Sequence, residues 1–139
     1  IKTKYGWLII YANIRNYYLG EQKVFGIDAV LLDLKDPTKI IGSIEDPLLI
    51  PQENYEINGK VPNVVFPTGA LVKNNDLYIY YGAADTSICL AKVSLKNLLK
   101  DILEKRLISF ERYSENPILE PSSRNAWESK AVFNPAAII

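Results

Sequence analysis

The stretch that decides the fold is Gly6–Tyr11, with the sequence GWLIIY, because a similar stretch returns seventy positions later as Asp76–Tyr81, with the sequence DLYIYY. A second pair has the same separation: Asp46–Pro51 reads DPLLIP, and Asn116–Pro121 reads NPILEP. Similar segments in the same order and at the same spacing predict that the chain contains two copies of one structural unit.

A third pair of similar segments, Val64–Ala70 and Ala131–Ala137, follows the two proline-flanked segments. Lys73–Asp76 is made of turn-forming residues between two apolar runs, which predicts a hairpin. Ile27–Leu34 and Ser87–Val93 predict further strands, because they are short, apolar and bounded by turn residues. Several short strands per unit with turns between them are typical of a propeller blade. We therefore expect an all-β chain of about two propeller blades.

One segment departs from the strand pattern. Ser94 is a typical helix N-cap residue. The apolar residues that follow it have helical spacing: Leu95, Leu98, Leu99, Ile102 and Leu103. We expect one short surface helix that covers a sheet edge, and a partner-binding helix is the alternative.

The composition excludes several classes of function. The chain has 16 basic and 16 acidic residues, so no net charge recruits nucleic acid or an anionic membrane. It has no histidine, no cluster of metal ligands and no glycine-rich phosphate loop, so we expect no metal or cofactor and no serine or cysteine triad. The single Cys89 fits a core position and a cytoplasmic protein. The acidic residues Glu45, Asp46, Glu53 and Glu56 indicate a solvated loop.

Two motifs carry a resemblance to a known family. Val61–Ala70 (VPNVVFPTGA) and Leu77–Thr86 (LYIYYGAADT) closely resemble the closing blades of glycoside hydrolase family 130. Gly6–Tyr11 and Leu31–Pro37 (LLDLKDP) fit the preceding blade of that family. The resemblance covers residues 1 to about 100, and the segment 116–137 is similar to the opening strand of a family member.

The resemblance implies a five-bladed propeller with a sugar pocket at its axis. Members cleave β-mannosides with inversion, by attack of inorganic phosphate or, in some subgroups, of water. The general-acid aspartate lies in earlier blades, so we expect no catalytic residue in this chain and no activity from it alone. Residues 1–108 would form the closing blades, and 109–139 the opening strand of a following propeller or the next unit.

The resemblance also implies partners. These are a mannose-containing oligosaccharide and the remaining propeller blades or other copies of the chain, because two blades leave exposed sheet edges. A non-catalytic carbohydrate-binding or structural propeller is the alternative function.

The candidate sugar-binding residues are Asp85, Asn63, Phe66, Pro62 and Asp28. The resemblance implies that the Asp85 carboxylate accepts hydrogen bonds from sugar hydroxyls. The Asn63 amide can donate and accept, and Phe66 can face the apolar side of a pyranose. From the residues alone, Asp85 and Asn63 also fit turn positions, and Phe66 also fits the core.

Departures from the family pattern bear on the chemistry. The phosphorylase pattern has His-Gly after Tyr11, whereas this chain has Ala12 and Asn13. That histidine belongs to the phosphate-handling set, so inorganic phosphate as co-substrate and hydrolysis both stay open. Asp28 puts a charge where the family has a small residue.

Overall fold

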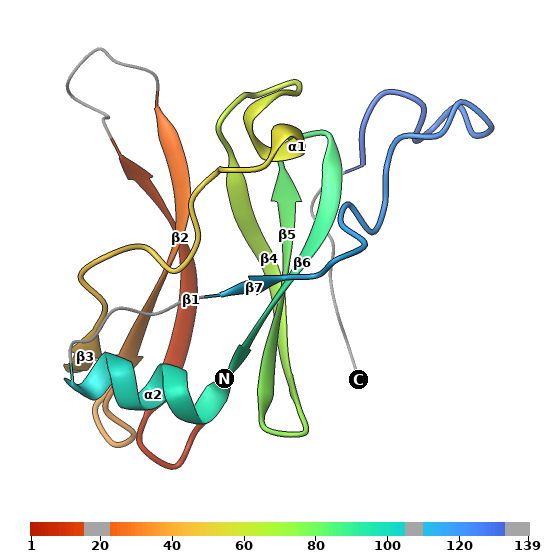
Figure 1. The fold of residues 1–139 in the computed structure, drawn as a ribbon. Coiled ribbons are helices and arrows are strands. Elements are labelled where there is room, and N and C mark those ends of the chain that lie inside the picture. The colour runs from red at the N-terminus through yellow and green to blue at the C-terminus, as the bar shows by residue number, and fades with distance from the viewer. Residues whose placement is uncertain (16–22, 105–109, 133–139) are drawn as a thin grey trace.

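The structure is a computed structural model that describes residues 1–15, 23–104 and 110–132. Within these ranges the chain forms two antiparallel sheets and two helices (Figure 1). The first sheet has the order β1 (Trp7–Arg15), β2 (Val24–Leu32) and β3 (Ile40–Ser43). The second has the order β4 (Val65–Lys73), β5 (Asp76–Ala83), β6 (Ser87–Ser94) and β7 (Glu111–Arg112). The helices are α1 (Asn54–Ile57) and α2 (Leu95–Glu104).

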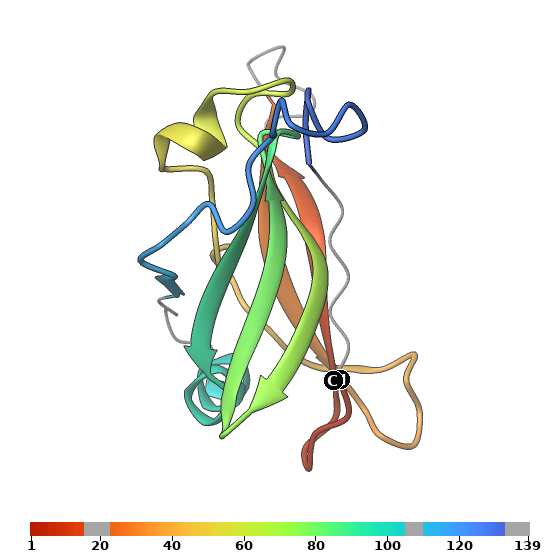
Figure 2. The same ribbon diagram turned by 90° about the vertical axis from the view of Figure 1, so that its right-hand side faces the viewer.

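The two helices mark opposite ends of the sheets. The long strands of both sheets run along one direction, with α2 at one end and α1 at the other (Figures 1 and 2). Within the described parts of the chain, neither helix has the length and apolar character needed to cross a membrane.

The core lies between the two sheets. In the first sheet Ile27, Ala29 and Leu31 are buried, and they share one face of β2 because side chains alternate along a strand. Asp28 and Val30 therefore lie on the opposite face. The second sheet contributes a similar buried row from β5: Leu77, Ile79 and Tyr81.

The hairpin between β4 and β5 is where the sequence predicts it. Lys73 pairs with Asp76, and the two residues between them, Asn74 and Asn75, have φ values of 52° and 66°. Two successive residues with positive φ are the signature of a type I′ turn, which matches the twist of the flanking strands. Asparagine tolerates this conformation better than most residues.

The predicted helix is present as α2. The Ser94 hydroxyl accepts a hydrogen bond from the Asn97 amide at 3.4 Å, as expected of an N-cap. The helix buries Leu98, Leu99 and Ile102, and it contacts β3 of the first sheet and β6 of the second. It therefore packs against both sheets.

The two proline-flanked segments dock on their sheets in the same way. In each copy, one isoleucine of a strand exchanges three backbone hydrogen bonds, of 2.8–3.3 Å, with two apolar residues of the segment: Ile27 with Leu48 and Leu49, and Ile88 with Ile118 and Leu119. The matched sequences DPLLIP and NPILEP thus make matched contacts.

Candidate functional site

Two connecting segments meet at the α1 end of the second sheet. Residues 58–64 lead from α1 to β4, and residues 84–86 form the turn between β5 and β6. The Lys60 amide donates to the Thr86 hydroxyl at 3.0 Å, and the Val61 amide donates to the Ala84 carbonyl at 3.1 Å. The Ala84 amide donates in return to the Val64 carbonyl at 2.9 Å. We call these two segments the loop–turn cluster.

Close backbone approach explains a glycine in the cluster. A Cβ atom added at Gly59 would lie 2.5 Å from the Ala84 carbonyl oxygen and 2.6 Å from the Thr86 hydroxyl oxygen. No side chain fits at this distance. Gly59 therefore lets the segment 58–64 lie directly on the turn.

The backbone of the cluster has positive φ at three positions. Asn63, Ala84 and Asp85 have φ values of 58°, 47° and 49°. An alanine in this region costs about 1–2 kcal/mol, whereas asparagine and aspartate adopt it more readily. Ala84 and Asp85 are the central residues of a type I′ turn, which the hydrogen bond from the Thr86 amide to the Ala83 carbonyl closes at 3.0 Å. Hydrogen bonds to neighbouring segments hold this conformation and so fix the direction in which the Asn63 and Asp85 side chains leave the backbone.

The structure brings three of the predicted site residues together. Pro62 is exposed, and Asn63 and Asp85 are half-buried, all within the loop–turn cluster. Phe66 follows on β4, opposite Gly82 near the end of β5. Its side chain is 41% exposed, so the interpretation of Phe66 as a core residue is wrong.

The cluster also touches the first sheet. The Asn63 carbonyl accepts a hydrogen bond from the Phe25 amide of β2 at 3.0 Å. The position of Asn63 is thereby tied to both sheets.

The fifth candidate, Asp28, does not join the cluster. It lies on the face of β2 that points away from the core, opposite Tyr11, and is only 6% exposed. Its Oδ2 atom accepts a hydrogen bond of 2.6 Å from the Asn13 amide group, whereas its buried Oδ1 atom has no partner among the described residues. Asn13 and Asp28, at both of which the sequence departs from the pattern that the resemblance implies, thus contact each other. Burial and the Asp28 charge raise the pKa of Tyr11.

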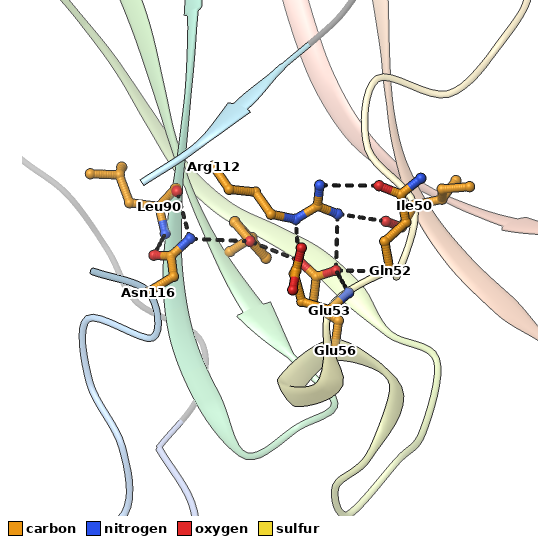
Figure 3. Close-up of polar contacts among 8 residues, drawn as sticks. Ile50, Gln52, Glu53, Glu56, Leu90, Arg112 and Asn116 are labelled. Atoms are coloured by element: carbon orange, nitrogen blue, oxygen red, sulfur yellow. Dashed lines mark hydrogen bonds and ion pairs between the residues drawn. The ribbon is translucent and has the colours of Figure 1, made fainter. Parts of the chain in front are cut away.

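A buried ion pair joins Glu56 of α1 to Arg112 of β7 (Figure 3). The sequence placed Glu56 in a solvated loop, and this is wrong, because Glu56 is completely buried. Its carboxylate accepts bonds of 2.9 Å from both Nε and Nη2 of Arg112 and from the Tyr81 hydroxyl. The amides of Gln52 and Glu53 donate to it as well, at 2.8 and 3.0 Å. Glu56 thus joins α1 to β5 and β7.

The environment of Glu56 determines its charge. Burial alone would raise the pKa of this carboxyl, but hydrogen bonds from Arg112 and from the two amides outweigh burial and lower the pKa below its usual value. Glu56 is therefore ionised, and the pKa of Tyr81 is raised by burial and by this charge.

Other groups do not form a reactive centre in the described part of the chain. Burial raises the pKa of the Cys89 thiol to about 12, so the thiol stays protonated and packs in the core. Among the described residues, no group of acidic or cysteine side chains is arranged to hold a metal ion. The cluster offers a carboxylate and an amide, and the neighbouring Phe66 on β4 adds an exposed aromatic ring. These groups suit the binding of a polyhydroxylated ligand.

Comparison with known proteins gives consistent matches. A family model described as β-1,4-mannooligosaccharide phosphorylase matches residues 1–105. A β-1,2-mannobiose phosphorylase from Thermoanaerobacter sp. (strain X514) is 47% identical over 93 residues, which are 67% of this chain and 29% of the relative. A 1,2-β-oligomannan phosphorylase from the same strain is 43% identical over 98 residues, which are 70% of this chain and 31% of that protein.

Solved structures agree with the sequence matches. The β-1,2-mannobiose phosphorylase of Listeria innocua, solved in complex with β-1,2-mannobiose, superposes with a TM-score of 0.65 at 37% identity. The match covers 73% of this chain and 28% of that structure. A putative glycoside hydrolase from Parabacteroides distasonis gives a TM-score of 0.57 at 31% identity, over 67% of this chain and 28% of that one. The chain spans less than a third of the length of each of these relatives.

These matches confirm the resemblance inferred from the sequence. They also confirm the prediction of an all-β chain that forms part of a propeller, with a short surface helix.

Proposed function

Because the chain belongs to glycoside hydrolase family 130, the family of the β-1,4-mannooligosaccharide phosphorylases, we propose that it is part of an enzyme that cleaves β-mannosides. Within that enzyme it supplies residues that bind the sugar. The observation that carries this proposal is the loop–turn cluster, which gathers Pro62, Asn63 and Asp85 in a hydrogen-bonded backbone at one end of the second sheet.

The proposed binding uses ordinary carbohydrate chemistry. The Asp85 carboxylate accepts hydrogen bonds from sugar hydroxyls, and such bonds are strengthened by its charge. The Asn63 amide reads a hydroxyl as donor or acceptor, and the exposed ring of Phe66 faces the apolar side of the pyranose. Since the hydrogen bonds of the cluster fix the backbone in advance, little conformational entropy is lost on binding.

The catalytic acid comes from outside this chain in our proposal, so the chain alone releases no product. The relatives are named phosphorylases, and phosphate is the co-substrate of that reaction. Here Ala12 and Asn13 stand where the family has His-Gly, and Asn13 is engaged by Asp28. This departure favours attack of water or binding without turnover as the second candidate function.

The division of the chain is also a proposal. We assign residues 1–108 to closing blades and 109–139 to an opening strand or the next unit. The family match over 1–105 supports the first boundary, and the matched docking of the two proline-flanked segments supports a repeat. The two parts share a sheet, because β7 pairs with β6.

A titration followed by NMR tests the proposed site. The ¹⁵N-labelled chain is titrated with β-1,2-mannobiose, with cellobiose as the matched control disaccharide. We expect saturable shift changes of the backbone amides of residues 60–64 and 84–86 with β-1,2-mannobiose, and weaker changes with cellobiose. Changes confined to the first sheet, or none at all, would overturn the proposal.

A further inference from the structure

We propose that Glu56 and Arg112 are a positioning pair for the sugar site: their buried ion pair holds the loop–turn cluster in its binding geometry. Arg112 lies beyond residues 1–105, the part that the family model matches. The inference rests on the proposed function for its ligand, although its structural basis is independent of that function.

Glu56 is connected to the cluster through its own backbone. Its carbonyl accepts a hydrogen bond from the Val64 amide at 3.2 Å, and the carbonyl of Ile57 accepts one from the Asn63 amide at 3.3 Å. The end of the segment 58–64 is therefore hydrogen-bonded to α1, the helix that carries the buried carboxylate. A shift of Glu56 must be transmitted to Asn63.

Arg112 is the other member of the ion pair. Its guanidinium binds Glu56 through two nitrogen atoms, and it also donates to the Ile50 carbonyl at 2.9 Å and to the Gln52 side chain at 3.3 Å (Figure 3). A bidentate arginine–carboxylate pair fixes orientation as well as distance. The pair thus defines where α1 sits relative to the second sheet.

Hydrogen bonds of Asn116 hold the segment that follows Arg112. Asn116 accepts a hydrogen bond from the Leu90 amide and donates one to the Leu90 carbonyl, both at 2.9 Å. Its amide also lies 3.5 Å from the Tyr81 hydroxyl, which donates to Glu56 (Figure 3). The segment that follows Arg112 is therefore bound to β6 at Leu90.

The arrangement fits a positioning role and not a catalytic one. Glu56 has no exposed surface, so it does not touch a ligand. The neighbouring cluster keeps its geometry through hydrogen bonds between the segment 58–64, the turn 84–86 and α1. A loosened anchor would let Asn63 and Asp85 relax away from their binding directions.

Hydrogen exchange and ligand affinity together test the inference. Glu56→Gln keeps the shape of the side chain and removes its charge. We expect it to speed exchange of the Lys60, Val61 and Ala84 amides at least tenfold more than exchange within the β1–β2 hairpin. We also expect it to weaken β-1,2-mannobiose binding, measured by the NMR titration, about tenfold.

Two further variants make the result decisive. Asp76→Asn removes a half-buried ion pair of the same sheet, Lys92–Asp76 at 3.0 Å, and should change neither readout. Arg112→Lys keeps the charge but loses the bidentate geometry, and it should reproduce the local effect of Glu56→Gln, also if the latter does not fold. Uniformly faster exchange in both sheets, or unchanged exchange and affinity, overturns the inference. If the wild-type chain binds no mannobiose, the proposed function fails, while the exchange data still decide the positioning role.

Discussion

Glu56 shows how one buried charge is stabilised in this protein. Five donors surround a carboxylate that has no exposed surface. Removing one partner of such a pair costs about 3–5 kcal/mol, mainly because the other charge loses its compensation. The ion pair is therefore important for stability as well as for position.

The lowered pKa of Glu56 predicts a pH dependence. An unfolded glutamate has a pKa of about 4.3, and the folded value lies below it. The stabilisation from Glu56 is thus complete above the unfolded pKa and is lost as the pH falls through the folded pKa. In urea unfolding, we expect the difference in unfolding free energy between wild type and Glu56→Gln to be constant above about pH 5 and to shrink towards pH 3. A difference that stays constant down to pH 3 would contradict this.

At the scale of elements, the amphipathic spacing of α2 makes a prediction about packing. Leu98 is completely buried against the sheets, whereas Leu103 of the same helix is 43% exposed. Leu98→Ala should lower the free energy of unfolding by about 2–5 kcal/mol. Leu103→Ala changes helix propensity in the same way and should cost less than about 1 kcal/mol. Urea unfolding measures both, and equal losses would show that the helix does not pack as described.

The elements that the sequence predicted are those with local signals. Asn74 and Asn75 predict a turn, and the apolar spacing after Ser94 predicts a helix, each from a few neighbouring residues. By contrast, α1 has only four residues, and its Glu56 is neutralised by Arg112, which is far away in the sequence. No local sequence pattern predicts a partner so far away, so the sequence alone favours a solvated loop for Glu56.

At the scale of the whole molecule, the two sheets differ in their edges. Among the strands that the structure describes, β1 is the edge strand of the first sheet, whereas its sequence match β5 lies between β4 and β6. An unpaired strand edge invites another strand. The remaining propeller blades or other copies of the chain are the partners we propose for this edge.

The sequence named the members of the candidate site but not their arrangement. The motifs identify Asn63 and Asp85, but the contact between their segments depends on hydrogen bonds between residues more than twenty positions apart. The resemblance also predicts Asp28 as a site residue, yet the alternation of side chains along β2 places it on the face of β2 that points away from the core. Among the described residues, the buried Oδ1 atom of Asp28 has no hydrogen-bond partner. This follows from how the chain packs around Asp28, which a sequence motif does not predict.

Calorimetry tests most directly whether the sugar binds at the loop–turn cluster. The wild type, Asp85→Asn and Asp33→Asn are each titrated with β-1,2-mannobiose. Asparagine tolerates the positive φ of Asp85, so the first variant removes charge without adding strain. Asp33 is a matched control, because its side chain accepts hydrogen bonds from the amides of Lys35 and Asp36 in a turn.

A hydrogen bond to a charged group contributes about 1.5–3 kcal/mol, and 1.4 kcal/mol is a factor of ten in affinity. We therefore predict that Asp85→Asn weakens binding at least tenfold, while Asp33→Asn binds like the wild type. Equal affinity of Asp85→Asn and the wild type would contradict the placement of the sugar site on the loop–turn cluster.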